Sequence, residues 1–217
     1  MNNFDYIAPV YDTLARLIFG RGLIEAQNTY LARIPPAARV LIMGGGSGQI
    51  LLDVVQRCEC EEIYYLEASQ KMIALARQNM QHAHTPTRIH YLCKKEIPPF
   101  PSQHFHAILT PFVLDLFHES TLDNIFQKLS PALMTGGYWL WTDFCLPTGP
   151  KRVPAWLFIQ SMYLFFKVCC GIQASKLPSV APFFELHKLK LRNKTSYMGG
   201  MVEARLYKKF DFYTNSS

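Results

Sequence analysis

The sequence predicts an α/β domain built around a parallel sheet, and three observations support this fold class. Short apolar runs alternate with helical patterns between residues 39 and 143, as in sheets built from repeated βα units. A glycine-rich loop stands between the first predicted strand and the first predicted helix. The chain has 217 residues, of which 49% are hydrophobic and 18% are charged. This composition favours one domain with a substantial core and argues against a disordered chain.

The βα-repeating part contains five predicted strands, at residues 39–43, 62–67, 88–93, 106–110 and 138–143. A helix is expected from Gln49 to about Arg57, and Ser69 is a plausible N-cap of the next helix. Ser120 and Asp123 form an S-x-x-D capping pattern that predicts the start of a third helix. A turn at residues 136–137 is expected to lead into the fifth strand.

The remainder of the chain has a different pattern. Residues 147–154 read as a connection containing proline and glycine, and residues 153–170 are almost wholly apolar. Segments 184–193 and 201–210 predict two antiparallel strands. A membrane span needs about 20 mostly apolar residues, and the apolar segment is shorter and contains Lys167. We therefore expect a core or substrate-lid helix and no transmembrane span, while a homodimer face and contact with a membrane surface stay open.

Charge and cysteine content narrow the function classes only slightly. The net charge of +6 permits acidic partners without selecting one. Basic residues alternate along 188–194, which suits the solvated face of a strand, so no nucleic acid is expected. The first residues lack both a basic region and an apolar run, which predicts a cytoplasmic protein with reduced thiols. The cysteines at 58 and 60 and the histidines at 82 and 84 do not have the usual zinc spacing, so no metal is expected.

The glycine loop has the spacing Gly44-x-Gly46-x-Gly48, with Gly45 inside it. Glycines allow the backbone to turn tightly and to approach a ligand closely. The start of the following helix adds free N–H groups, which favour a carboxylate or a phosphate. A dinucleotide fingerprint would need a further glycine where Gln49 stands, so the pattern favours an S-adenosylmethionine site over a dinucleotide site.

An acid follows the loop at the end of the second predicted strand. Glu67 lies at the position from which a carboxylate accepts hydrogen bonds from both hydroxyls of a ribose. The combination of strand, glycine loop, helix and acid predicts a nucleoside-containing cofactor, S-adenosylmethionine.

At this point the chain resembles the class I methyltransferases, particularly the branch that contains the ubiquinone/menaquinone-biosynthesis methyltransferases. The resemblance covers roughly residues 4–145. It rests on a lid-like segment at 4–12, the first motif at 40–48, the approach to the fourth strand at 99–106, and the turn at 129–137 before the fifth strand.

The resemblance implies a Rossmann-like, seven-stranded, mostly parallel sheet with helices on both faces and an antiparallel C-terminal strand pair. The implied division is lid helices in 1–35, a cofactor-binding core in 36–145, a variable apolar helical insertion in 146–182 and the strand pair in 183–217. Gly44, Gly46 and Gly48 would hold the methionine portion and Glu67 the ribose. Met72 would lie near the adenine and Tyr11 would close over the cofactor. The full expected cofactor site is Tyr11, Gly44, Gly45, Gly46, Gly48, Glu67, Ala68, Met72, Glu96 and Pro111.

Three positions differ from the family pattern. Ile42 stands where an acid is usual, Lys94 lies where Gly-Asp usually follows the third strand, and His106 replaces an aspartate before the fourth strand. Other groups would then hold the cofactor, with Glu96 or backbone carbonyls as candidates. These differences leave open a module that binds the cofactor with little activity. A nucleotide-dependent oxidoreductase is a further alternative.

No catalytic residue is assigned from the sequence. Methyl transfer requires alignment of the acceptor more than a fixed set of catalytic side chains. Asp115 and Asp143 could face the acceptor or bind loop amides, and His118 is better explained by a structural role than as a base. The expected activity is methylation of a small, apolar or aromatic acceptor, because the segment after the fifth strand often covers the acceptor in the resembling family.

Overall fold

The computed structural model describes residues 21–153, 155–157, 159–160 and 177–210. Two expectations from the sequence lie outside these residues. They are Tyr11 with the first part of the predicted lid, and most of the apolar segment 153–170.

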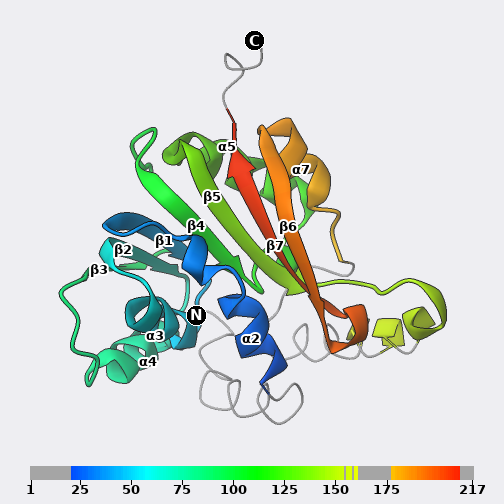
Figure 1. Cartoon of the computed structure of the whole chain (residues 1–217), viewed down its shortest axis with the longest axis horizontal. Coiled ribbons are helices and arrows are strands. Elements are labelled where there is room, and N and C mark those ends of the chain that lie inside the picture. The colour runs from blue at the N-terminus through cyan, green and yellow to red at the C-terminus, as the bar shows by residue number, and fades with distance from the viewer. Residues whose placement is uncertain (1–20, 154, 158, 161–176, 211–217) are drawn as a thin grey trace.

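A single seven-stranded sheet forms the centre of the molecule, in the order β3-β2-β1-β4-β5-β7-β6 (Figure 1). The first five strands pair in parallel, whereas β7 pairs antiparallel with both β5 and β6. The predicted mostly parallel sheet with an antiparallel C-terminal pair is therefore confirmed. The strands are β1 (Ala38–Met43), β2 (Cys60–Glu67), β3 (Arg88–Cys93), β4 (Phe105–Pro111), β5 (Leu133–Phe144), β6 (Leu189–Tyr197) and β7 (Val202–Lys209).

Helices cover both faces of this sheet. The first face packs against α3 and α4, and the second packs against α5 and α7. Short 3₁₀ helices connect several elements. The helices are α2 (Gly22–Asn28), η1 (Leu31–Arg33), α3 (Gln49–Arg57), α4 (Gln70–Met80), η2 (Leu114–Leu116), α5 (Glu119–Ala132), η3 (Gly149–Lys151), α7 (Ala181–Leu186) and η4 (Met198–Gly200). Described residues between 152 and 160 are also helical.

Alternation along the strands supplies the two apolar layers. In β1, Val40 and Ile42 belong to the core beneath α3 and α4, whereas Leu41 and Met43 belong to the core beneath α5 and α7. This is the two-residue period of a strand that is buried on both faces. Ile42 is fully buried, so this position, where the resembling family usually has an acid, contributes to the packing of the core.

Two boundaries differ from the sequence prediction around α5 and β5. The helix begins at Glu119, with His118 at the N-cap, so Ser120 lies inside it and the predicted capping pattern is wrong. Asp123 instead accepts a hydrogen bond from Gln127 one turn later, at 2.6 Å. The strand β5 begins earlier than predicted, at Leu133, and the predicted turn at Gly136 and Gly137 lies within it as an irregularity: pairing with β4 passes from Leu133 directly to Tyr138, and Gly136 has a φ angle of +81°.

The strand predicted from residue 184 begins later. Residues 181–186 form the helix α7, and β6 starts only at Leu189. The reason is tertiary packing, because the ring of Phe184 is fully buried and stacks on Tyr207 of β7 with the ring centroids 3.7 Å apart. Pro182, in the first turn of α7, suits the start of a helix.

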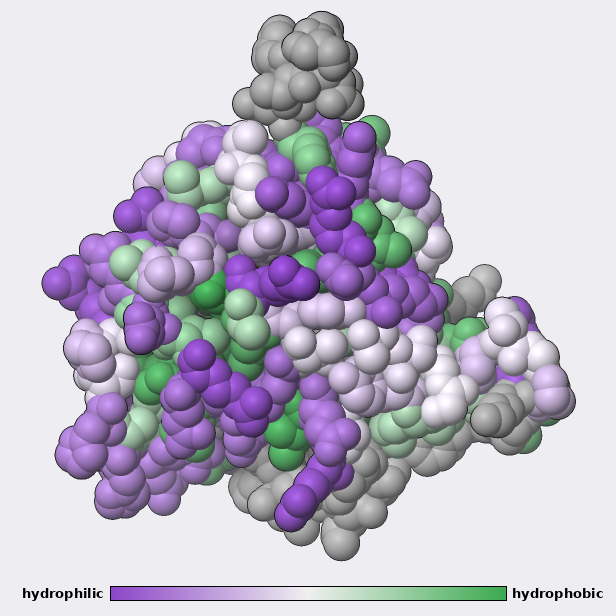
Figure 2. Space-filling model, viewed as in Figure 1, coloured by the Kyte–Doolittle hydropathy of each residue, from purple (hydrophilic) through white to green (hydrophobic). Residues whose placement is uncertain are grey.

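The surface of the described part is mixed. Figure 2 shows hydrophilic residues over much of the visible face, with hydrophobic residues in small separate groups. Large hydrophobic side chains that are exposed include Val153, Trp156 and Leu157 after β5 and Leu186 and Leu191 near β6. Among the described residues, no helix combines the length and apolar character needed to cross a bilayer.

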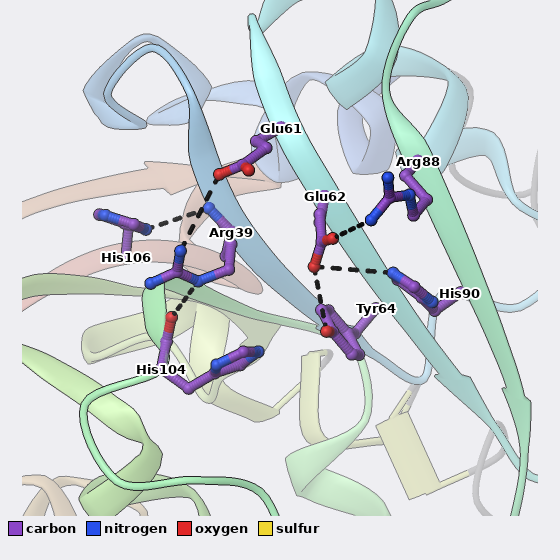
Figure 3. Close-up of polar contacts among 8 residues, drawn as sticks. All are labelled: Arg39, Glu61, Glu62, Tyr64, Arg88, His90, His104 and His106. Atoms are coloured by element: carbon purple, nitrogen blue, oxygen red, sulfur yellow. Dashed lines mark hydrogen bonds and ion pairs between the residues drawn. The ribbon is translucent and has the colours of Figure 1, made fainter.

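A network of charged and aromatic side chains lies near the starts of the parallel strands, and we call it the amino-end cluster (Figure 3). Glu62 is its centre, because its carboxylate accepts hydrogen bonds from the Tyr64 hydroxyl at 3.0 Å and from Arg88 at 2.8 Å. The His90 Nε2 lies 3.6 Å from the same carboxylate. The cluster consists of Arg39, Glu61, Glu62, Tyr64, Arg88, His90, His104 and His106.

The second half of the amino-end cluster joins β1 to the start of β4. The main-chain N–H of Arg39 donates to Nδ1 of His106 at 3.0 Å, and its side-chain Nε donates to the main-chain oxygen of His104 at 2.9 Å. Burial and the positive charge of Arg39 lower the pKa of His106 and of His104. His106, at the position where the resembling family usually has an aspartate, therefore acts as a neutral hydrogen-bond acceptor that fastens two strands.

Candidate functional site

The glycine loop lies at the carboxyl ends of the parallel strands, where β1 ends and α3 begins. The Gly44 N–H donates to the main-chain oxygen of Leu66 at 2.9 Å, which ties the loop to the end of β2. Gly46 and Gly48 have φ angles of +61° and +94°, in the left-handed region that side chains rarely adopt. The predicted position of the loop between strand and helix is therefore the observed one.

The glycines of the loop differ in the space around them: some are packed against other elements, and one faces open space. A Cβ on Gly48 would lie 2.8 Å from the Cα of Ala76 in α4, so this glycine allows α3 and α4 to pack closely. A Cβ on Gly44 would lie 2.5 Å from a methyl carbon of Val113, in the segment that follows β4. A Cβ on Gly46 would meet no described atom within 4 Å. The loop is thus held by contacts at both ends and presents its middle to open space.

Glu67, the last residue of β2, is oriented toward this loop. Its Oε2 accepts the N–H of Gly46 at 3.1 Å, and its Oε1 accepts the N–H of Ser69 at 3.0 Å. Burial raises the pKa of this carboxyl, while the main-chain N–H donors act in the opposite direction. Since an ionised carboxylate oxygen can accept more than one hydrogen bond, both oxygens retain acceptor capacity for a ligand.

The remaining predicted site residues lie in two places: two follow Glu67 in the chain, and two lie after β3 and at the end of β4. Ala68 is exposed beside Glu67, and Met72 is buried in the first turn of α4, where its N–H donates to the Ser69 hydroxyl at 3.2 Å. These two follow Glu67 at the same edge of the sheet. Pro111 ends β4 and is buried, whereas Glu96 is exposed in the bend after β3.

One side chain that supports the loop was not predicted. Tyr65 is buried in β2, and its hydroxyl donates to the main-chain oxygen of Gly46 at 2.7 Å. A Cβ on Gly45 would lie 2.5 Å from the same ring. The sequence signal was weak, since a tyrosine in a buried strand usually serves packing alone. Its hydrogen bond holds the peptide unit that follows Gly46.

The candidate catalytic side chains occupy very different places. His118 is exposed at the start of α5, whereas Asp115 and Asp143 are both buried and interact with each other. Asp115 lies in η2 after β4, and Asp143 lies near the end of β5. The structure thus brings together two of the three candidates that the sequence left open.

The geometry fits a nucleoside cofactor that carries an amino acid. The open space at Gly46 admits a close ligand, and the carboxylate of Glu67 beside it suits a pair of ribose hydroxyls. The start of α3 has no side-chain cap within the described chain, so its first turn leaves N–H groups for a ligand carboxylate. In the part of the chain that the structure describes, no group of three potential metal ligands was found.

Comparison with known proteins agrees with this geometry. Residues 40–137, which include the glycine loop and Glu67, match a family model described as a methyltransferase domain. No curated protein matches the chain in sequence.

Solved structures share the fold at low identity. The YcgJ protein of Bacillus subtilis has 14% identity and a TM-score of 0.65, over 87% of this chain and 99% of that one. A mitomycin 7-O-methyltransferase has 17% identity and a TM-score of 0.68, over 96% and 61%. The third is the 1,6-didemethyltoxoflavin-N1-methyltransferase of Burkholderia thailandensis with bound 1,6-didemethyltoxoflavin and S-adenosylhomocysteine. It has 12% identity and a TM-score of 0.65, over 96% and 87%.

Proposed function

We propose that this S-adenosylmethionine-dependent methyltransferase transfers the methyl group to a small apolar or aromatic acceptor. The observation that carries the proposal is an apolar cluster at the carboxyl ends of β4 and β5, which includes Phe112, the chain neighbour of the Val113 that contacts Gly44. Its buried members are Ala26, Phe144, Ile159 and Val202, and Phe112, Leu116 and Leu146 pack against them.

In the proposed cofactor site, Gly44, Gly45, Gly46 and Gly48 border the methionine portion of the cofactor. Glu67 accepts hydrogen bonds from the ribose hydroxyls, and Met72 and Ala68 lie on the adenine side. Pro111 marks the border with the acceptor. Tyr11 as a covering residue and Glu96 as a partner of the adenine remain predictions, as does the division of the chain into lid, core, insertion and strand pair.

The acceptor side is formed by the segment that follows β4. The rings of Phe112 and Phe144 lie with their centroids 5.1 Å apart, and Phe112 directly precedes Val113, the residue that contacts Gly44. Aromatic side chains in such a place favour flat or apolar ligands, because they bury apolar area and stack on other rings. An acceptor on this wall would reach the glycine loop from the β4 side.

Methyl transfer requires few specific catalytic side chains. The cofactor, when bound, supplies a methyl group attached to a positively charged sulfur. The chain's own residues bind both reactants, align the acceptor and keep water out, which are the main protein contributions to an in-line displacement. We assign no general base, since only an acceptor that loses its proton early requires one.

Two lines of support narrow the acceptor class. The resemblance to the ubiquinone/menaquinone branch favours phenols and quinols with apolar substituents. Two proteins of similar fold are named for O- and N-methylation of mitomycin and of a toxoflavin precursor, which are small ring compounds. We therefore propose an oxygen or nitrogen atom on a ring as the nucleophile.

The test is a methyl-transfer assay with S-adenosylmethionine and a panel of phenols, quinols, ring amines and aliphatic amines, with products identified by mass spectrometry. We expect turnover with ring acceptors, and we expect Phe144→Ser to raise KM for the acceptor while S-adenosylhomocysteine affinity stays within about twofold of the wild type. Turnover confined to aliphatic amines would contradict the proposal. Cofactor binding without turnover on the whole panel would favour a binding module in place of an enzyme.

A further inference from the structure

We propose that Asp115 and Asp143 form a proton-sharing clamp that fixes the segment after β4 against β5 and so positions one wall of the cofactor site. The inference depends on the proposed function for its link to the cofactor. Asp143 is fully buried and Asp115 is 5% exposed, so both carboxyl groups are almost entirely removed from water. Neither was assigned a role from the sequence.

The first step in the argument is the pattern of hydrogen bonds around Asp143. Its Oδ2 accepts the N–H of Asp115 at 3.1 Å, and its Oδ1 accepts the N–H of Phe144 at 3.2 Å. The carboxyl group of Asp115 belongs to the residue whose own N–H is bound by Asp143, and both carboxyl groups are buried. Two ionised carboxylates placed in this way would repel each other with little screening by water, so we infer that the pair shares a proton.

The second step is what the pair holds in place. The N–H of Phe112 donates to the main-chain oxygen of Thr142 at 2.7 Å, although Phe112 has a φ angle of +49°, which is unusual for a residue with a side chain. Between this bond and the Asp115 N–H lies Val113, whose side chain borders Gly44. The segment is therefore fastened to β5 at two points, and the residue between them forms a wall of the glycine loop.

The third step concerns the charges that face the pair. Glu203 lies opposite Asp143 in β7, and its carboxylate is bound by Lys194 at 2.6 Å and by the Arg205 Nε at 2.8 Å, which lowers its pKa. Burial raises the pKa of the neighbouring Cys145 thiol to about 12. Among the described groups around the pair, Glu203, Arg205 and Cys145 therefore keep a constant charge through the neutral and mildly alkaline range.

The pair affects stability in the opposite sense from Glu203, whose pKa is lowered. Burial, and then the charge of Asp115, raise the pKa of Asp143 well above its ordinary value. A raised folded-state pKa contributes stability that is present at low pH and is lost as the pH rises through that pKa. Loss of the shared proton leaves two carboxylates in a buried site, and their repulsion would release the η2 segment from β5.

The test compares Asp115→Ala with Asp115→Asn. The alanine removes the second carboxyl, whereas the asparagine donates an N–H to Asp143 and replaces the shared proton at every pH. Asp123→Asn serves as a control, because Asp123 lies on α5 and is hydrogen-bonded to Gln127. Two quantities are measured for each protein between pH 6 and 9.5, namely amide hydrogen exchange of the peptide 112–117 and the dissociation constant of S-adenosylhomocysteine.

At pH 7 we expect the amides of residues 112–117 to exchange about tenfold faster in Asp115→Ala than in the wild type. We also expect this variant to bind S-adenosylhomocysteine about tenfold more weakly. Asp115→Asn should stay within about twofold of the wild type in both measurements. As the pH rises, the wild type should lose affinity and protection more steeply than Asp115→Asn at the same pH. Asp123→Asn should follow the wild type throughout.

Equal exchange in the wild type and Asp115→Ala would overturn the clamp, and so would identical pH profiles of the wild type and Asp115→Asn. Normal affinity in an Asp115→Ala protein with fast exchange would overturn the link to the cofactor. If the wild type binds no S-adenosylhomocysteine at any pH, the proposed cofactor site fails. Hydrogen exchange still decides the clamp in that case.

Discussion

The two ends of the parallel sheet are built from the same strands but use polar residues in opposite ways. At the carboxyl ends, the loop around Gly46 is open and Glu67 faces it, while Asp115 after β4 and Asp143 in β5 form a pair of buried carboxyl groups. At the amino ends, Glu62 is surrounded by donors, and Arg39 binds main-chain and histidine acceptors (Figure 3). The carboxyl end keeps hydrogen-bond acceptors available for a ligand, whereas the acceptors at the amino end are used in contacts within the protein.

The two ends of the sheet also differ in how their contribution to stability depends on pH. His106 and His104 at the amino ends have lowered pKa values, so their contribution to stability is present above the unfolded-state value of about 6.5 and is lost as the pH falls from there through the folded-state pKa. Asp143 at the carboxyl end has a raised pKa, so its contribution is lost as the pH rises. The same sheet is therefore expected to be sensitive to acid at its amino end and to alkali at its carboxyl end, where we propose the cofactor site.

The largest effect is expected from Gly48→Ala. The new Cβ would lie 2.8 Å from the Ala76 backbone at a φ angle of +94°, so strain and overpacking act together. We expect a loss of about 3 kcal/mol in the free energy of unfolding, measured by denaturant titration. A loss below about 1 kcal/mol would mean that α3 and α4 can move apart at this contact.

Gly46→Ala distinguishes binding from folding at the same loop. Its Cβ would enter the open space assigned to the cofactor, and the backbone strain alone costs about 1–2 kcal/mol of stability. We expect S-adenosylhomocysteine affinity to fall about tenfold, measured by calorimetry on the folded fraction. Undiminished affinity would show that the cofactor does not approach this part of the loop.

The amino end is tested by pH. His106→Asn keeps an acceptor for the Arg39 N–H but cannot be protonated. Between pH 7.5 and 5 the wild type should lose about 1 kcal/mol more unfolding free energy than the variant, with partial exposure reducing the difference. Parallel pH curves of the two proteins would remove His106 from the account of acid sensitivity.

The smallest effect is expected from Glu62→Gln. The glutamine keeps an oxygen acceptor for Tyr64 but loses the charge that faces Arg88 and His90. We expect less than about 1 kcal/mol of lost stability by thermal unfolding, since Arg88 is largely exposed. S-adenosylhomocysteine affinity should be unchanged, and a tenfold loss would show that the two ends of the sheet are coupled.

The sequence predicted the parallel strands well because their apolar runs and the glycine loop are local signals. It failed where tertiary contacts decide the structure. Phe184 lies in an apolar run that reads as a strand, but its stacking on Tyr207 places it in a helix. Gly136 and Gly137 read as the turn before a strand, but β5 already begins at Leu133 and contains them as an irregularity in its pairing with β4.

The site was predictable to a similar degree. The loop and Glu67 lie where the spacing placed them, whereas the Tyr65 bond to Gly46 and the pairing of Asp115 with Asp143 join residues 19 and 28 positions apart. No spacing rule covers such contacts, because they depend on which strands become neighbours. A sequence names such residues as candidates, and only the sheet order shows that they meet.

The central claim, that the carboxyl end binds S-adenosylmethionine through Glu67, is tested by calorimetric titration of S-adenosylhomocysteine into the wild type, Glu67→Ala and Glu61→Ala, with NAD as a control ligand. Glu61 is a matched control, since it lies on the same strand at the amino end with its side chain 58% exposed. We predict micromolar binding to the wild type and to Glu61→Ala, and a loss on the order of 2–4 kcal/mol for Glu67→Ala. Equal affinity of Glu67→Ala and the wild type would contradict the claim, as would tight binding of NAD alone.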